Sequence, residues 1–243
     1  MIKTNTKLLV SVTNVEEALI ALDAGVDIID LKDPKVGALG ALPANIILEV
    51  TTAIDKRAVI SATVGENHSD IAGLIKTIGQ TSALGVDVIK IAMNMRLAND
   101  LLDVVDFLYL VKKLTKNNIK LVAVLFADHN LELNVLSKLK VLGFYGAMLD
   151  TAHKNGKNLI YYQPIEALTS FIELCLQYQF VTGLAGSLYV DSVIELVNLK
   201  PNYLGFRGGV CHDFKRQSNL DKEKVMVIKN MLQENNKVCA IAH

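Results

Sequence analysis

Ala24-Gly25-Val26-Asp27-Ile28-Ile29-Asp30-Leu31-Lys32 joins the end of an amphipathic segment to a short apolar run. The start of this stretch is echoed at Leu84-Gly85-Val86-Asp87 and again at Leu142-Gly143-Phe144-Tyr145. Glycine commonly follows the last turn of a helix, because it adopts the left-handed conformation without strain. Each copy therefore predicts a helix that stops directly before a strand.

Short runs rich in β-branched residues alternate with longer amphipathic segments along the whole chain. The predicted strands are 7–12, 26–32, 58–64, 86–93, 120–126, 145–151, 180–187 and 203–210. The predicted helices lie near 14–24, 43–54, 69–83, 98–117, 131–141, 163–178, 191–198 and 220–235. Asn14 followed by Glu17 resembles a capping box, and Asp191 and Asp221 are the candidate N-caps of the last two helices.

The predicted strands are so apolar that both faces of the sheet must be covered, which is typical of a parallel sheet. Regular strand–helix alternation with short connections favours closure into a barrel. The 243 residues match the length of about 250 that one such barrel needs. We therefore expect an α/β fold, a single-domain (β/α)8 TIM barrel over residues 1–243. The alternative is an open doubly wound sheet, but no Gly-x-Gly-x-x-Gly follows the first strand.

Composition excludes several classes of protein. The 25 lysines and arginines are interleaved with 25 acidic residues, so no basic surface for nucleic acid is expected. Cys175, Cys211 and Cys239 are an odd number without close pairing, which indicates reduced thiols and no structural disulfide. The polar start of the chain and the absence of a long apolar run predict a cytoplasmic protein that does not bind membranes. A homo-oligomer is compatible with this composition.

Charged residues stand at the ends of alternate strands. The second strand ends Asp30-Leu31-Lys32, the fourth buries Lys90 in an apolar run, and the sixth ends at Asp150, with Lys154 in the loop beyond. Side chains two positions apart point to the same face of a strand, and alternate strands of a barrel contribute to one interior layer. We therefore expect these five side chains to meet at the C-terminal mouth. The alternative for any single lysine is a snorkelling side chain or half of an ion pair.

Such a cluster suits carbonyl chemistry. A partly desolvated lysine among other ammonium groups loses its proton more readily than a lysine in water. Its free amine can attack a carbonyl group and form an imine, while a second lysine or an aspartate moves protons. The surplus of lysines favours anionic carbonyl substrates, sugar phosphates above all. No metal and no cofactor is expected.

Glycine-rich segments end the seventh and eighth strands, where barrels of this kind often bind phosphate. Small residues let backbone N–H groups approach an anion. The predicted phosphate-binding residues are Gly183, Ala185, Gly186, Ser187, Arg207, Gly208 and Gly209. The alternative is that these glycines only relieve packing or permit turns.

Other polar residues at the predicted mouth receive no assigned role from the sequence; they are Glu66, His68, Asp128 and His129. The glycine-containing segment 33–41 is either a loop that closes over substrate or a plain connector. His153 is expected to be a polar neighbour rather than a metal ligand, because no His/Asp/Glu set with ligand spacing surrounds it.

Four segments resemble the (5-formylfuran-3-yl)methyl phosphate synthases. The most specific is Asp30-Leu31-Lys32-Asp33-Pro34-Lys35-Val36-Gly37-Ala38-Leu39-Gly40-Ala41. The others are Leu149-Asp150-Thr151-Ala152-His153-Lys154-Asn155-Gly156-Lys157, Gly183-Leu184-Ala185-Gly186-Ser187-Leu188 and Gly205-Phe206-Arg207-Gly208-Gly209-Val210-Cys211. The resemblance implies a fold like that of class I aldolases. It also implies a lyase that builds the furan of methanofuran from two molecules of glyceraldehyde 3-phosphate.

Carried over by position, the resemblance makes Lys32 the Schiff-base lysine and Lys90 the proton acceptor, with Asp30, Asp150 and Lys154 completing the site. The segment reads Asp33-Pro34 and Gly37-Ala38, where archaeal members tend to have Asn-Pro and Gly-Ser. This departure points to a bacterial member in one-carbon metabolism with a methanofuran-like carrier. Two alternatives stay open: a class I aldolase that acts on another sugar phosphate, and a non-catalytic barrel that binds phosphosugars.

Overall fold

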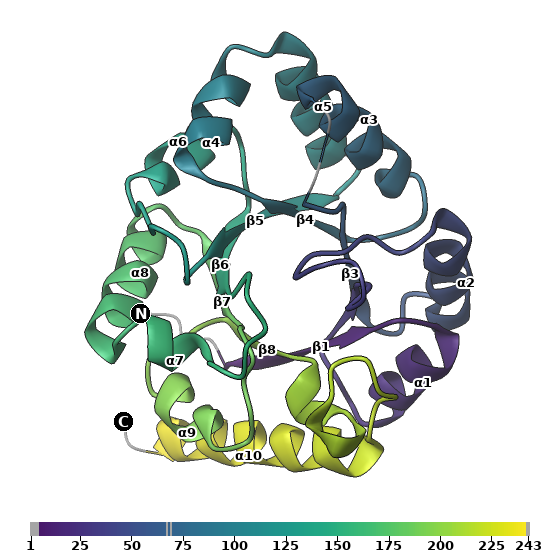
Figure 1. Ribbon diagram of the computed structural model, residues 1–243, viewed down its shortest axis with the longest axis vertical. Helices are drawn as coiled ribbons and strands as arrows, with labels where there is room; N and C mark the ends of the chain where they lie inside the picture. Colours follow the sequence, from purple (N-terminus) through teal and green to yellow (C-terminus); the bar gives the residue numbers. More distant parts are fainter. Residues whose placement is uncertain (1–4, 67, 69, 242–243) are drawn as a thin grey trace.

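Eight parallel strands form a closed barrel in which each strand pairs with its neighbours in the sequence and β8 pairs with β1 (Figure 1). The computed structural model describes residues 5–66, 68 and 70–241, and for residues 238–241 the backbone only. The strands are β1 (Lys7–Val12), β2 (Ile28–Leu31), β3 (Val59–Thr63), β4 (Val88–Ala92), β5 (Lys120–Phe126), β6 (Gly146–Asp150), β7 (Val181–Leu184) and β8 (Tyr203–Phe206). The predicted barrel is confirmed, and the open sheet is excluded.

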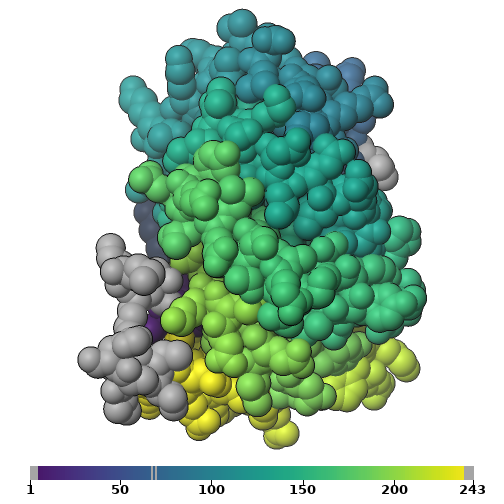
Figure 2. Space-filling view, turned by 90° about the vertical axis from the view of Figure 1, so that its left-hand side faces the viewer, coloured from purple at the N-terminus to yellow at the C-terminus, as the bar shows by residue number. Residues whose placement is uncertain are grey.

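Helices surround the ring of strands, with α6 and α8 on the left in Figure 1, and Figure 2 shows the surface of the molecule from that side. The helices are α1 (Val15–Asp23), α2 (Ala44–Ile54), α3 (Ile71–Ser82), α4 (Met95–Leu102), α5 (Val105–Lys116), α6 (Val135–Val141), α7 (Leu159–Tyr162), α8 (Ile165–Gln177), α9 (Ser192–Val197) and α10 (Lys222–Ile241). No helix of the described part of the chain is long and apolar enough to cross a membrane.

The three glycines of the repeated pattern end helices as expected. Gly25, Gly85 and Gly143 have φ angles of 74°, 83° and 82°. These left-handed angles explain why glycine stands at each of the three helix–strand junctions.

The aspartates of the same pattern satisfy backbone groups at the base of the barrel. Asp27 accepts a 2.8 Å hydrogen bond from Leu8 N, and Asp87 accepts one of 2.8 Å from Ile60 N. Asn202, before β8, accepts one of 2.7 Å from Thr182 N. Each polar side chain at the start of an even strand thus satisfies an N–H near the start of the odd strand before it.

The helix predicted at 98–117 is in fact two helices, α4 and α5. Asn94 starts α4 early, because its side chain accepts a 2.8 Å hydrogen bond from Leu97 N. The break before Val105 lets Leu101 and Phe107 both reach the core with no exposed surface. In one continuous helix these two side chains would point about 120° apart.

The predicted caps have different outcomes. Asn14 accepts a 2.9 Å hydrogen bond from Glu17 N, but the Glu17 carboxylate bonds Thr13 N at 2.8 Å rather than closing a box on Asn14. Asp221 accepts from Glu223 N at 3.1 Å and is confirmed as a cap. Asp191 stands directly before α9, as predicted, but its side chain makes no capping bond, so the prediction of a side-chain cap is wrong.

Side chains alternate between two cores. Residues such as Ile29, Ile89 and Leu149 point outward against the helices, whereas Leu9, Val124 and others fill the barrel. The inner core contains Leu39, which comes from the loop after β2 and has no exposed surface. The loop therefore covers part of the mouth above the strands.

Cys175 and Cys211 are buried free thiols. Burial raises the pKa of Cys175 to about 12 and that of Cys211 to about 11, so both are poor nucleophiles. The side chain of Cys239 lies outside the described residues.

Candidate functional site

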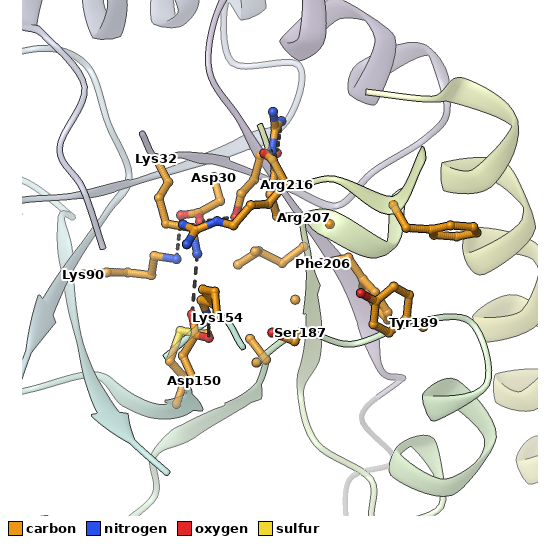
Figure 3. A pocket seen from close by; sticks show the side chains of 18 of the residues that line it. Asp30, Lys32, Lys90, Asp150, Lys154, Ser187, Tyr189, Phe206, Arg207 and Arg216 are labelled. Carbon is orange, nitrogen blue, oxygen red and sulfur yellow. Dashed lines mark hydrogen bonds and ion pairs between the residues drawn. The ribbon is translucent and has the colours of Figure 1, made fainter. Parts of the chain in front are cut away.

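A pocket opens at the C-terminal end of the barrel and contains all five charged residues predicted to meet there (Figure 3). Asp30 and Lys32 come from the end of β2, Lys90 from β4, and Asp150 and Lys154 from β6 and the loop that follows it. The inward direction of Asp30, Lys90 and Asp150 follows from the outward packing of their neighbours in each strand.

Asp30 and Lys90 form the most deeply buried ion pair of the pocket. Lys90 Nζ lies 2.7 Å from Asp30 Oδ1, and the two side chains are 2% and 0% exposed. Hydroxyl groups on the neighbouring strands also donate hydrogen bonds to the Asp30 carboxylate, Ser11 Oγ at 2.8 Å and Ser61 Oγ at 2.6 Å. Both serines stand beside Asp30 in the strand register. The sequence analysis missed them, although each is polar at an inward position of an apolar strand.

Burial and charge oppose each other in this pair. Burial alone would raise the pKa of Asp30, but the ammonium groups of Lys90 and Lys32 outweigh it and hold that pKa below the ordinary value. Burial lowers the pKa of Lys90, assisted by the charge of Lys32 and opposed by Asp30. Lys90 therefore reaches its neutral form at lower pH than an exposed lysine does.

The second carboxylate, Asp150, lies between two lysines. Lys154 Nζ donates to Asp150 Oδ1 at 2.9 Å and to Thr151 Oγ1 at 3.1 Å. Lys32 Nζ lies 3.5 Å from Asp150 Oδ2, which is a longer and weaker contact. Lys32 is thus the least firmly held of the three ammonium groups.

The two partners Asp150 and Lys154 also have shifted pKa values. Burial alone would raise the pKa of Asp150, but Lys154 and Lys32 together hold it far below its usual range. Burial lowers the pKa of Lys154, and the charges of Lys32 and Arg216 act in the same direction against that of Asp150. The pocket thus holds two firmly ionised carboxylates beside Lys90 and Lys154, whose pKa values are lowered.

The predicted phosphate-binding residues divide into two groups. Ala185, Gly186, Ser187 and Gly208 line the pocket together with Arg207. Gly183 and Gly209 do not line it, and their packing explains them. A Cβ on Gly183 would lie 2.2 Å from the ring of Tyr203, and one on Gly209 would lie 2.3 Å from Leu188 O. The phosphate prediction is corrected at these two positions, where glycine is required for close approach.

Arg207 lines the pocket, but all the hydrogen bonds of its guanidinium run to groups of the protein. Its guanidinium pairs with Glu17 at 2.6 Å and 3.1 Å, and it donates to the carbonyl oxygens of Ser11, Arg216 and Ser218. These bonds use all five of its N–H groups. The prediction of a phosphate ligand is therefore corrected: Arg207 joins β8 to α1 and to the segment before α10.

The sequence analysis also missed other residues that line the pocket, among them Tyr189, Phe214 and Arg216. The rings of Tyr189 and Phe214 lie 5.8 Å apart between centroids. Phe214 and Arg216 come from the segment between β8 and α10, which the sequence analysis treated as a connector. No local pattern marks them, because the segment reaches the pocket only through the folded chain.

The loop over residues 33–41 is fixed across the mouth by several hydrogen bonds. Asp33 N donates to Gly40 O at 2.8 Å, and Thr63 Oγ1 donates to the same oxygen at 2.8 Å. The Glu66 carboxylate accepts from Leu39 N. This gives Glu66, which had no assigned role, a structural one: it holds the loop that inserts Leu39 into the barrel.

Asp128 organises the loop that carries Lys154. Its carboxylate accepts from Ala152 N at 2.7 Å and from His153 N at 2.7 Å, and it lies 2.9 Å from His153 Nδ1. His129 lies beside His153, and one ligand atom each from Asp128, His129 and His153 fall within 4.8 Å of one another. The statement that no such set surrounds His153 was therefore wrong. His68, in the segment after β3, is half-buried, and burial lowers its pKa.

Comparison with known proteins identifies relatives over nearly the whole chain. A family model described as 4-HFC-P synthase matches residues 8–229. A Methylorubrum extorquens protein, provisionally described as a (5-formylfuran-3-yl)methyl phosphate synthase, is 39% identical over 220 residues, covering 90% of this chain and 88% of the relative. The (5-formylfuran-3-yl)methyl phosphate synthase of Methanocaldococcus jannaschii is 34% identical over 235 residues, which cover 92% of this chain and 98% of the relative.

Solved structures share the fold. 3-Hexulose-6-phosphate synthase from Salmonella typhimurium has a TM-score of 0.65 at 13% identity and covers 94% of this chain and 99% of its own. KGPDC from Streptococcus mutans has a TM-score of 0.64 at 12% identity and covers 94% of this chain and 98% of its own. At this identity the likeness shows a common barrel and nothing finer. By the match of its family model and the identity of its relatives, the chain belongs to the 4-HFC-P synthase family.

Proposed function

We propose that the protein condenses two molecules of glyceraldehyde 3-phosphate into (5-formylfuran-3-yl)methyl phosphate, as a carbon–oxygen lyase that works through a Schiff base on Lys32. The observation that carries the proposal is the convergence of Lys32, Lys90 and Lys154 with two ionised aspartates in one buried pocket. Family membership supports the product. The product would supply the furan of methanofuran or of a methanofuran-like carrier.

Lys32 is the best candidate for the nucleophile because its ammonium group is held least. Lys90 and Lys154 lie within 2.9 Å of their carboxylates, whereas Lys32 has one contact at 3.5 Å. A nucleophile must leave its partner to reach a carbonyl carbon, and a weak partner lowers the cost of that movement.

Lys90 suits the role of proton acceptor. Its pKa is lowered by burial, and its partner Asp30 is kept ionised, so the pair can take up a proton without leaving an unpaired charge. Asp150 contacts both Lys154 and Lys32, and the pair of Asp150 and Lys154 suits proton transfer to oxygen atoms of the substrate.

The steps balance without an oxidant or a metal. The amine of Lys32 adds to one aldehyde carbon and water leaves, which gives an imine. Lys90 removes the proton from the adjacent carbon, and phosphate leaves from the third carbon, which gives the enol of an α-keto imine. The third carbon of this enol bonds to the carbonyl carbon of the second triose, which reacts as its keto isomer after a proton shift. Ring closure of the terminal hydroxyl of the second triose onto the ketone, loss of two waters from the ring and hydrolysis of the imine complete the reaction. Overall, two triose phosphates give one furan phosphate, one inorganic phosphate and two waters.

The test is incubation of the purified protein with glyceraldehyde 3-phosphate, followed by mass spectrometry for the furan aldehyde and a phosphate assay. We expect furan and phosphate in equal amounts. A six-carbon sugar bisphosphate without free phosphate would instead indicate an aldolase. Substrate binding with no product and no borohydride adduct would indicate a phosphosugar-binding barrel.

A further inference from the structure

The segment between β8 and α10 folds back on itself and carries Arg216 to the pocket. An isolated antiparallel bridge joins Cys211 to Leu220, and His212 N donates to Asn219 O at 3.0 Å. Arg216 lies near the middle of this closed loop, half-buried, and it lines the cavity. Its position is therefore fixed by backbone hydrogen bonds on both sides.

The other cations that line the pocket are paired with carboxylates. Lys90 pairs with Asp30, Lys32 and Lys154 share Asp150, and Arg207 pairs with Glu17. Arg216, in contrast, has no carboxylate oxygen within 4.0 Å in the described part of the chain. Counted over the ionised side chains, the three lysines and Arg216 exceed the two aspartates by two positive charges.

The guanidinium of Arg216 has most of its hydrogen-bonding capacity unused. Among the described residues its one hydrogen bond runs from Nη2 to Gly37 O at 2.7 Å, so four of its five N–H groups remain. Burial lowers the pKa of Arg216, with Arg207 acting in the same direction and Asp150 against it. Arginine nevertheless stays charged in proteins, and its planar fork matches a phosphoryl group.

We propose that Arg216 binds the phosphoryl group of the second triose phosphate, the molecule that does not form the imine. This inference rests on the proposed function, which requires two phosphorylated molecules in one pocket. Ser187, in the loop after β7, lies in another part of the pocket and is suited to the first phosphate (Figure 3). Arg216 and the neighbouring Lys154 offer a separate, strongly positive position for the second.

The experiment compares Arg216→Met with wild type and with a control, Arg96→Met. Arg96 is on the surface of α4, with a side chain 92% exposed. Two dependences on glyceraldehyde 3-phosphate are measured for each protein: imine formation, trapped with borohydride and read by mass, and furan formation. The first reports binding of the imine-forming triose, and the second requires both molecules.

We expect Arg216→Met to raise the concentration for half-maximal furan formation at least about tenfold, because charge-assisted hydrogen bonds to phosphate are lost. Half-maximal trapping should stay within about twofold of wild type, and Arg96→Met should change neither. Added guanidinium should partly restore furan formation to Arg216→Ala. Equal shifts in trapping and furan formation, or no shift in either, would overturn the proposal.

A third measurement keeps this inference separate from the proposed function. Titration with inorganic phosphate, followed by ³¹P NMR, should show two bound phosphates in wild type and one in Arg216→Met. If wild type makes no furan but Arg216→Met binds one phosphate fewer than wild type, the proposed reaction is wrong and the assignment of Arg216 to a phosphate is supported. If furan is made and the phosphate count is unchanged in the variant, Arg216 is not the second phosphate ligand.

Discussion

Lys90 and Asp30 face each other across the interior of the barrel at 2.7 Å, from strands β4 and β2 that are not neighbours in the sheet. A pair this deeply buried is costly to desolvate and very costly to break, because removal of one partner leaves the other charge without compensation. The pair thus joins the stability of the barrel to its chemistry.

Asp30→Asn is therefore expected to lower the free energy of unfolding by about 3–5 kcal/mol. The measurement is denaturant unfolding at neutral pH, with Asp100→Asn as a matched control. Asp100 pairs with Arg96 at 3.9 Å on the surface, so its loss should cost less than about 1 kcal/mol. The double variant Asp30→Asn/Lys90→Met should recover much of the loss. Equal stability of Asp30→Asn and wild type would contradict the expectation.

The same carboxylate predicts the dependence of stability on pH. The pKa of Asp30 is lower in the folded protein than in the unfolded chain, where it is about 3.9. Its contribution to stability is then complete above that value and is lost as the pH falls below it. Below that pH, the free energy of unfolding of Asp30→Asn should therefore fall less steeply with decreasing pH than that of wild type.

Activity should depend on pH in the alkaline direction. Lys90 can accept a proton only in its neutral form, and burial lowers its pKa from the ordinary value of 10.5. We expect kcat/KM for furan formation to rise with pH and to level off with a midpoint below 10.5. A midpoint at or above the ordinary lysine value would show that the proton acceptor is an exposed group.

Lys32→Arg should abolish turnover while the protein stays folded. Arginine keeps the positive charge beside Asp150 but cannot be deprotonated to act as a nucleophile. A loss of more than about 10⁴-fold in kcat is expected, with Lys35→Arg, an exposed neighbour in the same loop, as the control. Borohydride trapping should place the adduct on the peptide that contains Lys32. An adduct on Lys90 or Lys154 would show that this lysine is the nucleophile and that Lys32 is a proton carrier.

Gly208→Ala tests phosphate binding without disturbing the packing. A Cβ at Gly208 would meet nothing closer than 3.5 Å, an ordinary contact, so the melting temperature should hardly change. The added methyl group should hinder approach of the anion and raise half-maximal substrate about tenfold. Gly186→Ala is the contrasting variant: its φ of 114° and a Thr151 atom at 2.9 Å predict a lower melting temperature. Unchanged substrate dependence in Gly208→Ala would show that no substrate phosphate binds beside Gly208.

Catalysis is predicted to need no metal ion. The imine supplies the electron sink that a divalent ion provides in metal-dependent aldolases. Treatment with EDTA should leave the rate within about twofold of its starting value. The opposite outcome is that EDTA abolishes activity and that zinc restores it in wild type but not in His153→Ala. That outcome would give the set of Asp128, His129 and His153 a catalytic role.

Sequence periodicity predicted much of the site because a strand has only two faces. Once Ile29 and Leu31 face the helices, Asp30 must point into the barrel, and the same reasoning places Lys90 and Asp150. The closure of the barrel then brings the three together without further information from the sequence.

Long-range partners were not predictable in this way. Arg207 was assigned to phosphate because nothing near it in the sequence reveals Glu17, which lies 190 positions away. Arg216 was missed for the converse reason, since its place in the pocket depends on the bridge between Cys211 and Leu220. The break between α4 and α5 likewise follows from the core, which requires both Leu101 and Phe107.

The aspartates at the base of the barrel have a consequence for dissecting the chain. Asp27 and Asp87 each bond to the strand just before their own, so the smallest piece that satisfies these N–H groups is two strands with the helix between them. A cut after β2 or β4 preserves both bonds within the fragments, whereas a cut after β1 or β3 separates a donor from its acceptor. The third copy of the pattern breaks the rule, because Tyr145 replaces the aspartate and lies against Lys120 at 4.4 Å. Fragment complementation should therefore succeed at the even boundaries in the first half of the barrel.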